Sequence, residues 1–158
     1  MIKAWKIIGN RKWKLDIVGF GKKEHYIKKF NLDDFKNIRF LKPVIKQNDK
    51  NKLFDKYDFL ALPTLSESFG LAILEALARR LPVLTTNRTP WENIQIKNSG
   101  WIINDSFEEL KLVLYEIFNS SDKEFFIKKK NTINVIKDYD TKKISKLYFK
   151  AYKNLKNI

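Results

Sequence analysis

The stretch LSESFGLAILEAL, at residues 65–77, carries the clearest structural signal in this chain. It follows a short apolar run and places small residues directly before an apolar helical pattern. Small residues let the backbone approach a ligand closely, and Ser68 is placed to cap the helix. Because the first N–H groups of a helix lack intrahelical partners, they form a site for an anion. The stretch therefore predicts a strand, a ligand-binding turn and a helix.

Two acids in this stretch, Glu67 and Glu75, are separated by seven residues. At about 100° per residue, one apolar face of the helix would comprise Leu71, Leu74, Leu77, Ala78 and Leu81. Glu75 falls at the edge of that face, where a carboxylate is partly desolvated and requires hydrogen-bond donors. Both acids are thus candidates to flank a ligand over the start of the helix. The alternative is that Glu67 only favours the helix dipole and that Glu75 is an ordinary surface residue.

Length and composition indicate one packed globular domain over residues 1–158. The 158 residues are 44% hydrophobic and include no cysteine, which excludes disulfides, thiolate metal sites and a cysteine nucleophile. No apolar run approaches the roughly 20 residues that span a bilayer, and the first residues do not resemble a signal peptide. We therefore expect a cytoplasmic protein.

The formal net charge of +14 raises the question of nucleic-acid or membrane binding. Of the 32 basic residues only five are arginines, and the lysines are spread along the chain. Surfaces that read bases or grip phosphates tend to favour arginine. A basic nucleic-acid-binding module is therefore the least favoured hypothesis, while weak attraction to the anionic inner face of a cell membrane stays open.

Short apolar segments alternate with helical patterns through the first two thirds of the chain. The predicted strands are residues 14–18, 38–41, 59–62, 82–86 and 100–103, and the predicted helices before residue 65 are 2–9, 22–30 and 49–57. Gly9 and Asn10 would end the first helix. Since the strands are apolar rather than alternating, they indicate a short-stranded parallel sheet with helices on both faces. The pattern is that of an α/β fold.

From residue 105 onward the chain reads as helix alone. Ser106 and Ser121 each begin a capping-box pattern, and an apolar stripe runs from Ile144 to Leu155. We expect these helices to close the domain.

Two features nearer the start of the chain are weaker signals. Gly19-Phe20-Gly21 predicts a tight strand-to-helix turn but lacks the full glycine fingerprint of a phosphate loop. His25 has no catalytic partners around it in the sequence, so we assign it to the surface.

The order of these segments closely resembles the C-terminal, nucleotide-sugar-binding domain of GT-B-fold retaining glycosyltransferases of the group 1 family. The resemblance rests on FLKP at residues 40–43, ALPTLSESFGLAILEALARRLPVLTT at 61–86, TPWEN at 89–93 and SGWII at 99–103. The resemblance covers nearly the whole chain. Within the family, the chain is similar to members that build bacterial surface polysaccharides and lipopolysaccharide cores. It implies a Rossmann-like three-layer domain and transfer of a sugar from a nucleotide-sugar to a saccharide or lipid-linked acceptor.

The resemblance also implies roles for individual residues. Glu67 would be the catalytic residue and would contact hydroxyls of the donor sugar, and Glu75 would take the ribose hydroxyls. The substrate-binding residues would be Ser68, Phe69, Gly70 and Leu71, through their backbone amides, together with Gly19 and Leu41 near the nucleotide base. No metal or other cofactor is implied.

Some features depart from the family pattern. Lys42 and Arg80 stand where the family usually has glycine. The family begins this domain with a strand and a basic loop, and it carries an N-terminal acceptor-binding domain before it. We therefore expect a fragment, a shortened gene product or half of a split enzyme, with weak donor binding and little transfer alone. The alternatives are a non-catalytic remnant or partner subunit, and a homodimer could seal the uncovered sheet edge.

Overall fold

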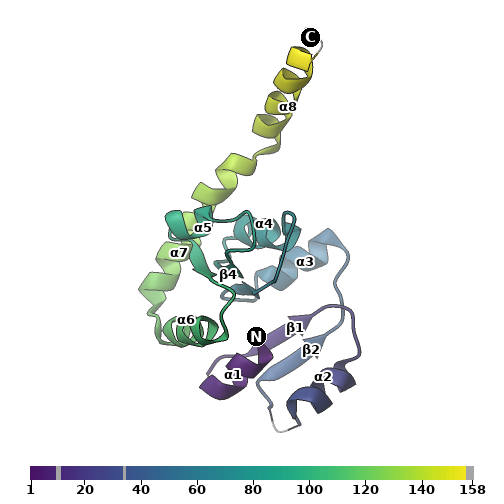
Figure 1. Cartoon of the computed structure of the whole chain (residues 1–158), viewed down its shortest axis with the longest axis vertical. Coiled ribbons are helices and arrows are strands. Elements are labelled where there is room, and N and C mark those ends of the chain that lie inside the picture. The colour runs from purple at the N-terminus through teal and green to yellow at the C-terminus, as the bar shows by residue number, and fades with distance from the viewer. Residues whose placement is uncertain (10–11, 34, 156–158) are drawn as a thin grey trace.

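The computed structural model describes residues 1–9, 12–33 and 35–155 and has the predicted α/β fold (Figure 1). The predicted stop at Gly9 is confirmed, since this glycine adopts the left-handed conformation with φ of 62°, while Asn10 lies outside the described residues. The strands are β1 (Leu15–Val18), β2 (Ile38–Leu41), β3 (Leu60–Leu62), β4 (Val83–Thr86) and β5 (Gly100–Ile103). The helices are α1 (Ile2–Ile8), α2 (Lys23–Phe30), α3 (Gln47–Phe54), α4 (Leu71–Ala78), α5 (Asn93–Ile96), α6 (Phe107–Asn119), α7 (Asp122–Ile136), the 3-10 turn η1 (Lys137–Tyr139) and α8 (Thr141–Leu155).

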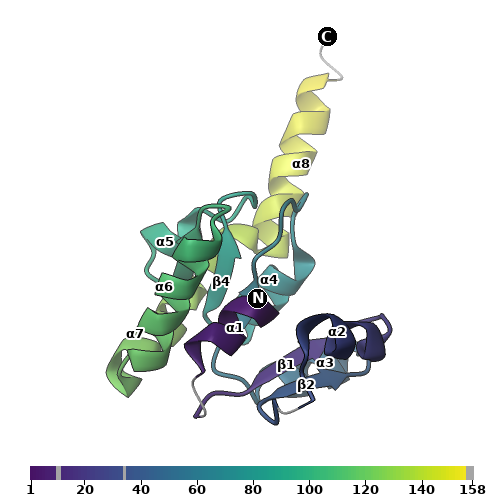
Figure 2. The same cartoon turned by 60° about the horizontal axis from the view of Figure 1, so that its bottom comes forward.

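All paired strands run parallel, as predicted, but they form two sheets. β1 pairs with β2, with Leu15 opposite Ile38. β4 lies between β3 and β5 in the second sheet, with Val83 opposite both Leu60 and Gly100. β1 and β3 are therefore end strands of separate sheets, and the two sheets lie apart in Figures 1 and 2.

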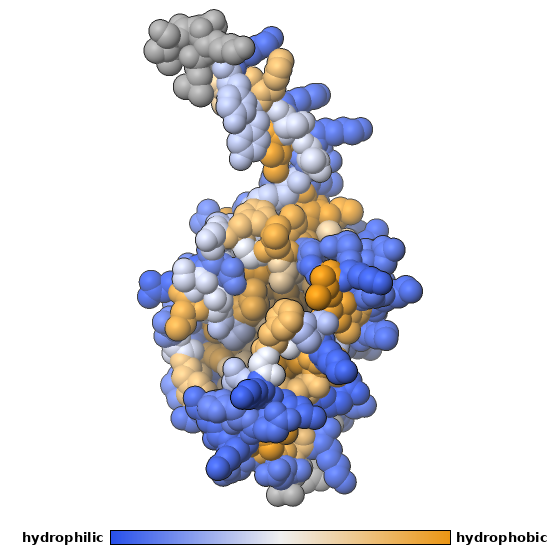
Figure 3. Space-filling model, turned by 90° about the vertical axis from the view of Figure 1, so that its right-hand side faces the viewer, coloured by the Kyte–Doolittle hydropathy of each residue, from blue (hydrophilic) through white to orange (hydrophobic). Residues whose placement is uncertain are grey.

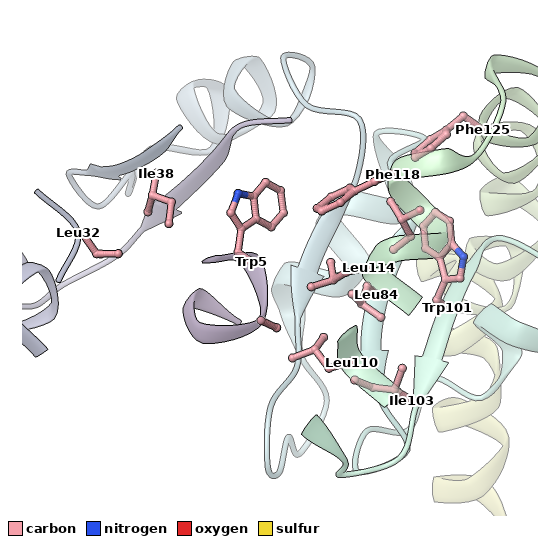
Figure 4. Close-up of a cluster of buried hydrophobic side chains, with 12 residues drawn as sticks. Trp5, Leu32, Ile38, Leu84, Trp101, Ile103, Leu110, Leu114, Phe118 and Phe125 are labelled. Atoms are coloured by element: carbon pink, nitrogen blue, oxygen red, sulfur yellow. The ribbon is translucent and has the colours of Figure 1, made fainter. Parts of the chain in front are cut away.

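The main apolar core joins α1 and α6 to residues of both sheets, from Ile38 on β2 to Leu84 on β4 and Ile103 on β5 (Figure 4). Trp5 meets Phe118 edge to face, with ring centroids 4.8 Å apart, and Leu114 is completely buried beside them. A second cluster joins α4, α5 and α7 through Ile73, Leu77, Trp91, Ile94 and Val135. β4 is buried at every position because it has a strand on each side and helices over it.

The close packing of β4 and β5 explains the glycine that begins β5. A Cβ on Gly100 would lie 2.1 Å from the Val83 carbonyl oxygen and 2.8 Å from Ile94 Cγ2. No side chain fits there without moving the backbone. Both contacts come from other elements, so the need for glycine at this position arises from packing.

Helix starts follow the predicted capping patterns unequally. Ser121 and Glu124 form a complete capping box at α7. At α6, Ser106 accepts from the Glu109 amide, but the Glu109 carboxylate accepts from the Asn104 backbone and side chain instead of closing the box. The structure also starts α3 earlier than predicted and adds the short helix α5, which the sequence pattern did not indicate.

The expectation that the last helix closes the domain is wrong. α8 projects away from the body in both views (Figures 1 and 2) and carries apolar and hydrophilic side chains along its length (Figure 3). Leu147, Tyr148, Phe149 and Tyr152 are each at least 60% exposed. Its amphipathic pattern predicted a buried face, but in the described residues that face has no apolar surface against it.

Candidate functional site

A cavity of about 670 Å³ lies at the carboxyl ends of β1 and β2. The structure brings two predicted ligand-binding residues together here, because Gly19 follows β1 and Leu41 ends β2. The rest of the wall comprises Ile2, Ile17, Val18, Phe20, Gly21, Lys22, Lys23, Glu24, Tyr26, Phe40, Lys42 and Pro43. Crevices beyond the carboxyl ends of parallel strands are the usual ligand sites of such folds.

The turn after β1 depends on glycine for its conformation. Gly21 has a φ of 141°, which L side chains rarely adopt, and it lies beside the start of α2. Lys22, Lys23 and Lys42 give the cavity rim a positive charge against the single acid Glu24 in this lining. The site therefore offers an apolar floor and a basic rim.

Glu75 lies in an adjoining hollow of about 760 Å³. Lys50 Nζ on α3 donates to its two carboxylate oxygens at 3.1 and 3.4 Å. The Glu75 side chain is 22% exposed, as expected for a carboxylate at the edge of a buried face with a donor beside it. Lys50 could not be identified from the sequence because α3 and α4 meet only in the tertiary structure. Ile17, Val18, Ile2 and Tyr26 line both hollows, so the two adjoin.

The turn before α4 is held by aromatic contacts that sequence reasoning missed. Trp91 Nε1 donates to the Phe69 carbonyl, and the Phe69 ring packs 5.2 Å from Trp91 and 5.6 Å from Tyr139. Gly70 has a φ of 79°, and a Cβ there would lie 3.1 Å from Ile73 Cδ1. Trp91 thus fixes the turn. The sequence shows this tryptophan in the TPW segment, but only the tertiary structure shows that it contacts Phe69.

Two predictions about this helix are wrong. Ser68 does not cap α4, since Gly70 occupies the N-cap and makes no side-chain hydrogen bond. Leu71 is 66% exposed, and the buried face is formed by Ile73, Ala76 and Leu77. The reason is that α4 packs against α7 and Trp91. These contacts bury a different face of the helix from the one that the helical periodicity predicted. The first amides of α4 remain free of a side-chain cap, as an anion site requires.

Glu67 occupies a different position from the other candidates. Its amide donates to the Arg88 carbonyl at 3.4 Å, and its side chain is half-buried. Neither hollow has residues 67–71 in its lining, whereas Glu75 lies in one and Gly19 and Leu41 in the other. The predicted residues therefore fall into two groups, one around the hollows and one on the turn before α4.

An ion-pair cluster on β1 was not predicted. Arg39 donates to both Asp16 carboxylate oxygens at 2.7 and 2.6 Å, and Tyr57 Oη donates to the same carboxylate at 2.7 Å. The hydrogen bond from Arg39 is the main cause that lowers the pKa of Asp16, with Tyr57 adding to it. Burial, followed by the hydrogen bond to Asp16, raises the pKa of Tyr57 to about 12. The cluster ties β1, β2 and the end of α3 together.

Three further observations bear on the type of site. His25 is exposed on α2, in agreement with its assignment to the surface. Among the described residues, no group of three or more His, Cys, Asp or Glu side chains is arranged to hold a metal ion. Within the same residues, no helix has the length and apolar character needed to cross a membrane.

Residues 1–118 match the protein family described as Glycosyl transferases group 1. A curated relative, an uncharacterized glycosyltransferase of Haemophilus influenzae, is 24% identical over 151 residues, which cover 91% of this chain and 42% of the relative. The solved structure of WaaG, a glycosyltransferase involved in lipopolysaccharide biosynthesis, is 28% identical with a TM-score of 0.62, over 81% of this chain and 34% of that one. Anabaena Alr3699/HepE in complex with UDP-glucose has a TM-score of 0.70 at 16% identity, over 99% of this chain and 44% of that one. The chain thus spans less than half the length of each.

Proposed function

The chain belongs to the group 1 glycosyl transferases, and from this premise we propose that it is the donor-binding part of an enzyme that transfers a sugar from a nucleotide-sugar. The acceptor would be a saccharide or a lipid-linked saccharide of a bacterial surface polysaccharide or lipopolysaccharide. The involvement of WaaG in lipopolysaccharide biosynthesis and the UDP-glucose complex of Alr3699/HepE support this choice.

One observation carries the proposal: the cavity at the carboxyl ends of β1 and β2 adjoins the hollow that holds Glu75. A nucleoside needs an apolar surface for its base and an acceptor for its ribose hydroxyls, and the two hollows offer both. The base would lie against Gly19 and Leu41, and the ribose would approach the Glu75 carboxylate. Lys50 Nζ donates to both oxygens of that carboxylate.

The turn before α4 would receive the rest of the donor. The uncapped amides at Gly70 and Leu71 would bind the diphosphate, with Ser68 and Phe69 completing the turn. Glu67 would contact hydroxyls of the donor sugar. As the bond from the sugar to the diphosphate breaks, positive charge grows on the sugar and negative charge on the leaving group, which the amides stabilise. We expect transfer to need no divalent metal, so addition of EDTA would leave it unchanged.

A titration with UDP-, GDP- and ADP-sugars at millimolar concentration, followed by amide NMR, tests this function. Binding should shift Gly19, Leu41, Gly70 and Glu75, whereas Ser121 on the far helix serves as an unaffected control. The proposal fails if none of the three donors shifts any of the four. Tight binding of DNA or RNA that falls steeply with salt would instead favour a nucleic-acid-binding module.

The acceptor would be bound by polypeptide beyond this chain, and the isolated chain would transfer sugar weakly or not at all. The coverage of 42% of the curated relative supports this division. If the chain is a subunit of a split enzyme, transfer appears only when a separate acceptor domain is added. If it is a non-catalytic remnant, the complex stays inactive. Light scattering tests whether a homodimer forms instead.

The position of α8 supports an additional role at an anionic membrane surface. α8 carries five lysines and no acid, beside exposed Leu147 and Phe149. Amphipathic basic helices of this type lie in the headgroup region of anionic bilayers. Co-sedimentation with vesicles containing phosphatidylglycerol tests this role, and equal sedimentation with neutral phosphatidylcholine vesicles would contradict it.

A further inference from the structure

The turn that begins α4 has few backbone hydrogen bonds of its own. Within the part of the chain that the structure describes, the amides of Ser68, Phe69 and Gly70 have no acceptor. The Glu67 amide donates to the Arg88 carbonyl at 3.4 Å, which is long for a hydrogen bond. Free amides can receive an anion, but these backbone bonds alone do not hold the amides in one position. The turn therefore depends on the packing of its side chains.

Three aromatic rings form a closed triangle at this turn. The ring centroids of Phe69 and Trp91 lie 5.2 Å apart, and those of Phe69 and Tyr139 lie 5.6 Å apart. The centroids of Trp91 and Tyr139 are 4.7 Å apart. Trp91 also donates to the Phe69 carbonyl, and it is completely buried although it precedes a helix in a loop. Because each ring contacts the other two, the position of Phe69 depends on both of its neighbours.

Tyr139 reaches this turn from a distant part of the chain. It is the last residue of η1, and α8 begins directly after it, where the Asp140 carboxylate accepts from the Lys142 and Lys143 amides at 2.9 and 3.1 Å. The match to the group 1 family ends at residue 118, so Tyr139 lies outside it. The segment that leads into α8 thus contacts the turn before α4 through one ring.

We infer that Tyr139 is a positioning residue for the diphosphate of the donor, an inference that rests on the proposed site at the start of α4. Its ring holds Phe69 against Trp91, and the fixed Phe69 backbone keeps the free amides in place for the phosphate oxygens. Hydrogen bonds from amides to phosphate are charge-assisted and depend on direction, so a turn that moves loses them. Tyr139 lines neither hollow, so the base and ribose should bind without it.

The alternative is that Tyr139 only stabilises the fold. It packs on the same apolar cluster as Leu77 and Val135, so loss of its ring should lower stability in either case. The two roles differ in the ligand that they affect. A loss of stability alone reduces the folded fraction and weakens uridine and UDP binding equally. A loss of positioning weakens the binding of UDP and leaves that of uridine unchanged.

NMR titrations of the whole chain with uridine and with UDP, followed at the Leu41 amide, separate these roles. In Y139L the affinity for UDP should fall at least tenfold, which corresponds to the loss of about one charge-assisted hydrogen bond. Its affinity for uridine should stay within twofold. Y139F keeps the ring and should bind both ligands as the unmodified chain does. F125L is the matched control, because Phe125 packs against Trp13 and Trp101 in the other cluster and should change neither affinity.

The indole N–H signals provide a second readout that needs no ligand. Trp91 donates to Phe69, whereas Trp13 and Trp101 donate to acceptors on α6. Y139L should speed solvent exchange of the Trp91 indole at least tenfold and leave the other two unchanged. F125L should change only the other two, and Y139F should change none. If Y139L does not fold, Y139M fills more of the same space and is used with the same expectations.

The outcomes distinguish this inference from the proposed function. Equal loss of uridine and UDP affinity in Y139L, normal UDP binding in Y139L, or an unchanged Trp91 indole would overturn the role of Tyr139 while the donor site stands. Failure of the unmodified chain to bind either ligand would overturn the donor site, and the role of Tyr139 with it.

Discussion

Replacement of Glu75 by glutamine separates its two roles, because E75Q keeps the shape of the side chain and removes its charge. The pair with Lys50 spans 3.1 Å, but the two side chains are 22% and 32% exposed, so water screens it. Partly exposed pairs contribute up to about 1 kcal/mol, and a change of this size shifts the melting temperature of a domain of this length by roughly 2–4 °C. E75Q should therefore fold normally.

Nucleotide binding should respond more strongly than stability. Hydrogen bonds from ribose hydroxyls to a charged acceptor contribute about 1.5–3 kcal/mol, so E75Q should weaken binding of UDP by roughly 10- to 100-fold. Isothermal titration calorimetry of UDP, with thermal unfolding followed by circular dichroism on the same samples, measures both quantities.

K50M is the matched control for this prediction. It breaks the same ion pair but leaves the carboxylate, so its melting temperature should fall about as much as that of E75Q. Its affinity for UDP should stay within about threefold of the unmodified chain, because the ribose still meets a charged acceptor. Normal UDP binding by E75Q, or an equal loss of affinity in K50M, would show that the Glu75 carboxylate does not bind the ribose.

Three other changes have outcomes that follow from the geometry. W91F removes the donor to the Phe69 carbonyl and should destabilise the chain by about 1–3 kcal/mol, as measured by urea unfolding; an unchanged midpoint would exclude that bond as a stabilising contact. G100A places a Cβ against the Val83 carbonyl and should cost at least about 2 kcal/mol, and a normal melting temperature would contradict the packing of β4 on β5. The pKa of Asp16 is lowered in the folded chain, so the stability that this carboxylate contributes is present above its unfolded pKa of about 3.9 and is lost as the pH falls through the lower folded value. In thermal melts from pH 7 to pH 2, the melting temperature of the unmodified chain should exceed that of D16N by a constant difference above about pH 5. This difference should shrink below about pH 4, and a constant difference at every pH would disprove the linkage.

The local elements were largely predictable because their signals lie in adjacent residues. The strand from Gly100 to Ile103 and the capping box at Ser121 lie where the patterns placed them. Gly19 and Leu41, which the family resemblance implied, line one cavity because parallel strands bring their carboxyl ends to one edge of a sheet. These features depend on periodicity and turn chemistry, which a sequence displays directly.

Other features could not be predicted because they depend on what packs against each element. Leu71 was expected inside and is exposed, since α7 and Trp91 choose which face of α4 is buried. Lys50 reaches Glu75 from a helix 25 residues away. An apolar stripe in the sequence indicates that a helix can bury one face, but it does not indicate which element will cover that face. α8 has such a stripe and nevertheless projects from the body of the molecule (Figure 1).

The sequence alone determined that residues 65–77 form a turn between a strand and a helix, with two acids on either side of the helix start, and that parallel α/β repetition supports it. Only the tertiary structure decided that Gly70 rather than Ser68 begins the helix, and that Glu75 meets Lys50 while Glu67 lies apart. It also decided that β1 and β3 belong to separate sheets and line one hollow together with Glu75. The physical reason is that hydrophobic burial and backbone hydrogen bonding between distant segments depend on which surfaces meet, and this information is not contained in any short stretch of sequence.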